Sequence, residues 1–112
     1  MDANEYQRQA MRSASAAPES AGNLVVAALG LCGESGEFAD RVKKHIAQGH
    51  PLEQGKLAEE LGDVCWYIAF ACTALGLDLG EVMAGNIDKL LRRYPERFST
   101  EASLKRADAG EG

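Results

Sequence analysis

The sequence predicts an all-α domain, built as a four-helix bundle. Its long segments carry apolar residues three and four positions apart, the spacing that places side chains on one face of a helix. No segment alternates apolar and polar residues as a half-buried strand does. Gly and Pro residues divide the chain into four helical segments, and the short connections favour helices that pack beside one another.

The four helices are expected at the ranges 3–14, 23–48, 52–75 and 78–94. Pro18 and Gly22 lie in the small-residue segment after the first helix and interrupt it. The other three helices are expected to end at Gly49, at Gly76 and before Pro95, because Gly accepts the left-handed cap and Pro cannot continue a helix. These residues set the order of the bundle.

With 112 residues, the chain is long enough for one domain. We assign residues 1–98 to that domain and expect the polar segment 99–112 to be a flexible C-terminal tail. A core of this size is small, so helix packing between copies would help to stabilise it. We therefore expect a homo-oligomer.

Charge and composition exclude several classes of protein. The net charge of -5 offers no basic face for a nucleic-acid polymer. The longest apolar stretch, residues 64–77, is too short to span a bilayer, and the polar N-terminus does not resemble a signal peptide. The three cysteines form no Cys-x-x-Cys pair, which favours a reducing compartment. We expect a cytoplasmic protein without a membrane partner.

Apolar stripes mark the faces of the second and third helices that we expect to form the core. They include Val42 and Ile46 on the second helix and Leu61 on the third.

Two pairs of carboxylates follow these stripes. Glu34 and Glu37 lie at the edge of one stripe, and Glu60 and Asp63 lie at the same edge of the other. A shift of 26 residues superimposes the two helices, with Glu34 on Glu60 and Glu37 on Asp63. One such pair is usually a solvated helix face. Two equivalent pairs at a core edge would repel one another and lose hydration unless they held a cation or took up protons.

The same shift superimposes Gly36 on Gly62. Each glycine costs a helix about 1 kcal/mol relative to alanine. The cost is easier to understand if the two backbones approach closely or leave room beside the acids.

The ligand types indicate which cation would bind. All four candidates are hard oxygen donors, and neither helix supplies a His or Cys at the spacing of a zinc or di-iron site. Mg²⁺, with Mn²⁺ as a possible substitute, fits this set best and usually keeps waters while binding phosphate oxygens. The acids therefore predict a magnesium site for a phosphorylated substrate.

Basic side chains follow one edge of the fourth helix, where Asn86, Lys89 and Arg93 share a face. They would neutralise a metal-bound phosphate, although cations near a helix C-terminus are also common for electrostatic reasons. Lys44 and Arg41 continue the line of Glu37, where binding of phosphate and pairing with nearby acids explain them equally well.

Tyr67 continues the line of Glu60 and Asp63 by one turn. Its ring is placed to stack on a base, with its hydroxyl group reaching a polar atom. We expect neighbouring Trp66, on another face, to serve packing or an interface.

Three segments together resemble the MazG-like nucleotide pyrophosphohydrolases: LGLCGESGEFADRVKKH, KLAEELGDVCWYIA and NIDKLLRRYPERF. The signature is Glu-x-x-Glu, a spacer of 22 residues here, and Glu-x-x-Asp, followed by Asn-x-x-Lys and Arg-Tyr-Pro. The resemblance covers residues 4–98 and implies an all-α fold that assembles as a homodimer or homotetramer. It also implies Mg²⁺-dependent hydrolysis of a (deoxy)nucleoside triphosphate to the monophosphate and pyrophosphate, in a role such as nucleotide-pool housecleaning.

Carried over position by position, the resemblance gives metal ligands, substrate contacts and a general base. The implied metal ligands are Glu34, Glu37, Glu60 and Asp63. The implied phosphate and sugar contacts are Lys44, Asn86, Lys89 and Arg93, with Tyr67 near the nucleoside and Tyr6 and Gln7 near the base. We favour Glu37 as the proton acceptor, with Glu34 close behind.

Two alternatives stay open at this point. One is an enzyme like phosphoribosyl-ATP pyrophosphohydrolase, which shares the same general motif. The other is a non-catalytic helical module that dimerises or binds nucleotides without turnover.

Overall fold

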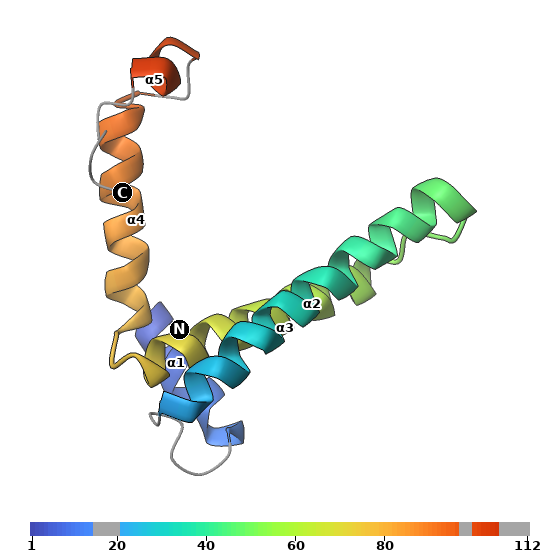
Figure 1. Ribbon diagram of the computed structural model, residues 1–112, viewed down its shortest axis with the longest axis horizontal. Coiled ribbons are helices and arrows are strands. Elements are labelled where there is room, and N and C mark those ends of the chain that lie inside the picture. Colours follow the sequence, from blue (N-terminus) through green and yellow to red (C-terminus); the bar gives the residue numbers. More distant parts are fainter. Residues whose placement is uncertain (15–20, 97–99, 106–112) are drawn as a thin grey trace. The chain divides into compact units, whose positions relative to one another are not determined.

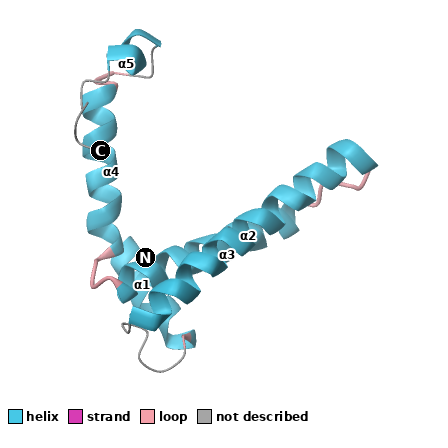
Figure 2. Cartoon of the chain, in the orientation of Figure 1, coloured by secondary structure: helices cyan, strands magenta, loops and turns pink. Residues whose placement is uncertain are grey.

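A computed structural model describes residues 1–14, 21–96 and 100–105. Its elements are one 3-10 turn and five α-helices: α1 (Ala3–Ala10), η1 (Met11–Ser13), α2 (Ala21–Gln48), α3 (Gln54–Ala74), α4 (Leu79–Arg93) and α5 (Thr100–Lys105) (Figure 1). The described residues include no strand (Figure 2), which confirms the all-α class. The four expected helices are present, and the first ends in the 3-10 turn. The short α5 lies within the segment we expected to be a flexible tail.

The chain divides into two compact units, Met1–Leu79 and Gly80–Gly112. The first unit holds α1, α2 and α3, and the second holds nearly all of α4 together with α5. The buried core of the first unit joins α1 to α3 and to the residue that opens α4, and consists of Ala10, Ala69, Cys72 and Leu79. Small side chains dominate this core, so the helices approach one another closely there.

Helices α2 and α3 form a hairpin and run side by side along most of their length (Figure 1). The hairpin turns at Gly49, whose φ of 72° lies in the left-handed region that favours glycine. The His50 amide donates to the Lys44 carbonyl oxygen at 3.1 Å, and His45 Nδ1 lies 2.8 Å from the His50 carbonyl oxygen. These contacts fix the start of the connection to α3.

Gly30 allows the two long helices to interlock. A Cβ atom at this position would lie 2.1 Å from Cε1 of Tyr67, much closer than real side chains approach. The Tyr67 ring therefore packs directly on the α2 backbone. Its other neighbour is Trp66, whose ring meets it edge-on with 5.0 Å between centroids.

Two polar side chains attach α1 to the rest of the unit. Trp66 Nε1 on α3 donates to the Ala10 carbonyl oxygen and to Ser13 Oγ, both at 3.0 Å. From α1, buried Gln7 donates to Thr73 Oγ1 and to the Leu77 carbonyl oxygen, and its own Oε1 accepts from the Leu79 amide at 2.8 Å. Gln7 thus serves as a hydrogen-bonding link between α1 and the end of α3.

The apolar stripes of the long helices are less buried than the sequence led us to expect. Val42, Ile46 and Leu61 are 37%, 78% and 50% exposed, although we assigned them to the core. Two packed helices bury only the seam between them, so residues at the flanks of each stripe stay at the surface.

Among the described residues, no single helix is both long enough and apolar enough to cross a membrane. Helices α3 and α4 meet the length and hydropathy criteria only when they are counted together as one bent pair.

We predict that Gln7→Ala destabilises the first unit by about 1–3 kcal/mol or more, because the Leu79 amide and the Leu77 carbonyl oxygen would lose their partner. Chemical denaturation followed by circular dichroism measures this change. Gln9→Ala, on an exposed position of the same helix, is the matched control and should leave the free energy of unfolding nearly unchanged. Equal stability of the two variants would contradict the linking role of Gln7.

Candidate metal centre

The hairpin brings three carboxylates together. Glu34 and Glu37 lie one turn apart on α2, and Glu60 faces them from α3. One oxygen from each side chain lies within 4.8 Å of the others. Oxygens this close, on two rigid helices, form a three-sided set that a single cation would contact.

Burial makes this set unusual for an acidic surface. Glu60 is only 6% exposed, and Glu34 is half-buried. Oε2 of each of these two residues is buried and accepts no hydrogen bond within the described chain. Buried acceptors without a partner lower the stability of the fold. Carboxylate oxygens are also ligands of divalent cations, so a bound cation would remove this cost.

The electrostatics support the same interpretation. A hydrogen bond with Glu37 raises the pKa of Glu60, and burial and the charges of Glu37 and Asp63 raise it further, while Arg41 opposes them. Burial raises the pKa of Glu34, and the charges of Asp63 and Glu60 add to this effect. Without a cation, Glu34 and Glu60 thus hold protons more tightly than ordinary glutamates do.

Asp63, the fourth predicted ligand, lies outside the three-oxygen group. Its charge nevertheless raises the pKa values of both Glu34 and Glu60, so it belongs to the same electrostatic cluster. Asp63 also acts on α1, where burial first, and then the charges of Cys65 and Asp63, raise the pKa of Tyr6.

Arg41 is the cation that the structure places beside the carboxylates. Its Nε lies 3.6 Å from Glu60 Oε1, so α2 and α3 are bridged one turn beyond Glu37. Of the two roles that the sequence left open for Arg41, this contact is the pairing one. In the sequence, the signal for this ion pair was the position of Arg41, four residues after the candidate ligand Glu37.

The glycines superimposed by the 26-residue shift leave open space. A Cβ atom built on Gly36 or Gly62 would meet no atom within 4 Å. Of the two explanations given above, these positions fit room beside the acids, whereas close approach of the helices occurs at Gly30.

A cavity of about 570 Å³ opens next to Glu37, between α2 and the connection to α3. Lys44 lines this cavity and pairs with Asp40 at 2.9 Å. Hydrogen bonding to Lys44 is the main cause of a lowered pKa of Asp40, and Lys43 contributes as well. Lys44 is thus ion-paired and also faces a cavity.

The remaining predicted contacts lie on three other parts of the chain, α3, α1 and α4. Tyr67 is half-buried between Gly30 and Trp66, so two protein neighbours already contact its ring. The amide of Gln7 is engaged by the protein itself and is not set aside for a base. The basic edge of the fourth helix lies on α4, in the second unit, and comprises Asn86, Lys89 and Arg93.

Comparison with known proteins places these residues in a family context. Residues 26–98 match the family model of the MazG nucleotide pyrophosphohydrolase domain. The Gene 37 protein of Mycobacterium phage L5 is 38% identical over 69 residues, which are 58% of this chain and 60% of that protein. The chain therefore matches less than two thirds of that relative's length. No solved structure matches the chain significantly.

We predict that the stability of the metal-free protein falls as the pH rises above about 5. The folded-state pKa values of Glu34 and Glu60 lie above their usual value of 4.5, so the folded chain binds more protons than the unfolded chain in this range. Their stabilising contribution is complete below the unfolded pKa and is lost as the pH rises through the folded pKa. Asp40 acts in the opposite sense, but only as the pH falls below its usual value of 3.8.

Thermal unfolding between about pH 5 and pH 8, with and without Mg²⁺, measures this dependence. Mg²⁺ at neutral pH should raise the melting temperature and flatten the profile. Glu60→Gln should weaken both effects. A melting temperature that rises with pH in this range, or that does not change when Mg²⁺ is added, would contradict the assignment of the carboxylates as a metal centre.

Proposed function

Because the chain belongs to the MazG nucleotide pyrophosphohydrolase family, we propose that it hydrolyses nucleoside triphosphates to the monophosphate and pyrophosphate with Mg²⁺. One observation on the structure supports the metal-dependent chemistry. Two buried carboxylate oxygens, Oε2 of Glu34 and of Glu60, accept no hydrogen bond from any described residue and lie beside a third carboxylate, Glu37. A divalent cation would satisfy them and would leave coordination positions for phosphate oxygens.

We propose Glu34, Glu37 and Glu60 as metal ligands, with Asp63 completing the set. Their hard oxygen atoms suit Mg²⁺, and Mn²⁺ as a substitute. When bound, the metal supplies charge stabilisation to the phosphate and lowers the pKa of a coordinated water. The protein supplies two rigid helices that hold the carboxylates in position before the substrate arrives.

We propose Glu37 as the proton acceptor. Unlike Glu60 and Glu34, Glu37 is exposed, so a water molecule can reach it from solvent. Glu37 also forms a hydrogen bond with Glu60, whose pKa is raised, so the two carboxylates can share a proton that Glu37 accepts. Glu34, which lies one turn before Glu37 on α2, is the alternative.

The substrate contacts stay predictions. Lys44 lines the cavity beside Glu37, and Tyr67 lies on α3 one turn beyond Asp63. The α4 residues Asn86, Lys89 and Arg93 would meet the charge of the departing pyrophosphate. Housecleaning of noncanonical nucleotides is the role that we propose for this reaction.

We also propose that the chain works as a homodimer or homotetramer. The apolar side chains that the hairpin leaves at its surface support this, among them Leu29, Ile46 and Leu61, which are 69%, 78% and 50% exposed. Burial of these side chains against a second copy would add to a small core.

We predict that a panel of canonical and modified (d)NTPs with Mg²⁺ includes at least one that the protein cleaves to monophosphate and pyrophosphate, detected by chromatography. Glu60→Gln should lower kcat/KM by at least about 100-fold, because it removes a ligand charge from a site that holds metal. Glu59→Gln changes the neighbouring exposed residue on the same helix and should leave kcat/KM unchanged.

Other outcomes would contradict the proposal in distinct ways. Release of single phosphate would indicate a different reaction. Cleavage of phosphoribosyl-ATP in strong preference to every (d)NTP would assign the chain to that enzyme type. Nucleotide binding without hydrolysis, unaffected by Glu60→Gln, would indicate a non-catalytic module.

A further inference from the structure

Arg41 contacts both the carboxylate cluster and the cavity beside it. Its Nε atom lies 3.6 Å from Glu60 Oε1, and its side chain also lines the cavity that borders Glu37. Arg41 is exposed, whereas Glu60 is buried. The guanidinium therefore pairs with a buried carboxylate and has accessible space within its reach.

The contact between Arg41 and Glu60 is an ion pair without a close hydrogen bond. Hydrogen bonds between nitrogen and oxygen in proteins span about 2.7–3.2 Å, and the distance from Nε to Oε1 is longer. Arg41 thus acts on Glu60 mainly through its charge. This charge opposes the effects of the Glu37 hydrogen bond and of burial, which raise the pKa of Glu60. Another cation can replace a contact of this kind.

The acid next to Arg41 in the chain does not compete for its charge. Asp40 pairs with Lys44 at 2.9 Å and with Lys43 at 3.4 Å, so two lysines already neutralise it. Within the described part of the chain, the ion pair of Arg41 is the one with Glu60. The positive charge of Arg41 is therefore directed at the carboxylate cluster.

A metal ion and Arg41 would act on the same carboxylate. Glu60 offers Oε1 to Arg41, while its Oε2 has no hydrogen-bond partner among the described residues. A cation held by Glu34, Glu37 and Glu60 would share Glu60 with the guanidinium, and like charges on one carboxylate repel each other. The charge of Arg41 therefore lowers the affinity of the cluster for a free cation.

We propose that Arg41 is a positioning residue, which serves as the counter-ion of Glu60 in the metal-free chain and gives up this contact when the metal binds. The inference rests on the metal centre of the proposed function. In the metal-free chain, the guanidinium holds Glu60 beside Glu37 against the repulsion between the two carboxylates. In the metal-bound chain, it turns to the cavity that it already lines. The site is thus formed in advance without a high affinity for the free ion.

The affinity of the chain for Mn²⁺ distinguishes a counter-ion from a structural brace. Loss of a brace would loosen the cluster and weaken Mn²⁺ binding. Loss of a counter-ion removes a repulsive charge, so Arg41→Met should bind Mn²⁺ about fivefold more tightly or more. Electron paramagnetic resonance of free Mn²⁺ measures this affinity, at about pH 7.5 to limit competition from protons.

Melting temperatures supply a second measurement of the same exchange. Arg41→Met should lower the melting temperature of the metal-free protein by a few degrees, because Glu60 loses its counter-ion. At saturating Mn²⁺, the variant and the wild type should melt at the same temperature, because the metal-bound wild type no longer uses the contact.

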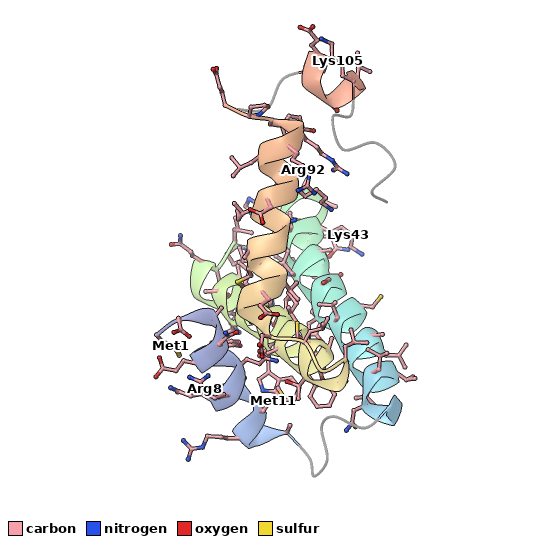
Figure 3. All side chains as sticks on the ribbon, turned by 90° about the vertical axis from the view of Figure 1, so that its left-hand side faces the viewer. Met1, Arg8, Met11, Lys43, Arg92 and Lys105 are labelled. Carbon is pink, nitrogen blue, oxygen red and sulfur yellow. The ribbon has the colours of Figure 1, made fainter. Side chains whose placement is uncertain are left out.

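Lys43→Met is the matched control. Lys43, labelled in Figure 3, lies two residues after Arg41 on α2 and pairs with Asp40. This variant removes the same charge from the same helix and leaves Asp40 its contact with Lys44. Its Mn²⁺ affinity should stay within about twofold of the wild type, because solvent screens this exposed charge.

Two further variants of Arg41 separate charge from shape. Arg41→Lys keeps the positive charge, so its Mn²⁺ affinity should also stay within about twofold of the wild type. Arg41→Gln removes the charge but keeps a polar side chain, and it should tighten Mn²⁺ binding as Arg41→Met does. Arg41→Gln therefore tests the inference even where Arg41→Met does not fold.

Two results would overturn the inference. Weaker or unchanged Mn²⁺ binding by the neutral Arg41 variants would leave Arg41 as a structural brace. Equally tightened binding in Arg41→Lys or Lys43→Met would show that the charge of Arg41 is not the cause. Both results are compatible with pyrophosphate release by the wild-type chain. The proposed function itself fails if no nucleotide is cleaved, and the metal centre fails if Glu60→Gln leaves Mn²⁺ binding unchanged.

Discussion

Mutual repulsion among carboxylates is the constraint on which this structure depends. Glu34, Glu37 and Glu60 place oxygens within 4.8 Å of one another, and burial of Glu34 and Glu60 removes much of the water that would screen their charges. Arg41 offsets only part of this charge, at 3.6 Å from one oxygen of Glu60. The remaining cost is met by protons, through the raised pKa values of Glu34 and Glu60, or by a cation. A fold that accepts this cost has a site prepared for a charged ligand.

The rest of the first unit keeps these carboxylates from moving apart. Gly30 lets Tyr67 pack onto the α2 backbone, which fixes the register of the hairpin one turn from Glu34. Trp66 and Gln7 then attach α1 to α3 through hydrogen bonds. Rigid helices therefore carry the acids, as a preorganised site requires.

Local chemistry explains why much of this was predictable. Helical periodicity and the glycines at 49 and 76 located the helices, and the repeated acid pairs identified three residues that meet in space. The sequence did not reveal that Gln7 would bond with Leu79 or that Gly30 would receive Tyr67. Those contacts join residues far apart in the chain, and no periodic pattern encodes them. Burial of Ile46 was predicted wrongly, because periodicity identifies an apolar face without showing what covers it.

The most direct test of the account is a crystal structure of the protein grown with Mn²⁺, with anomalous diffraction to locate the ion. We expect an anomalous peak bonded to carboxylate oxygens of Glu34, Glu37 and Glu60. The Oε2 atoms of Glu34 and Glu60, which have no hydrogen-bond partner in the described part of the chain, should be among its ligands or should bond to its waters. A cluster without a peak, in crystals that bind Mn²⁺ elsewhere, would contradict the central claim that these three side chains form a metal centre.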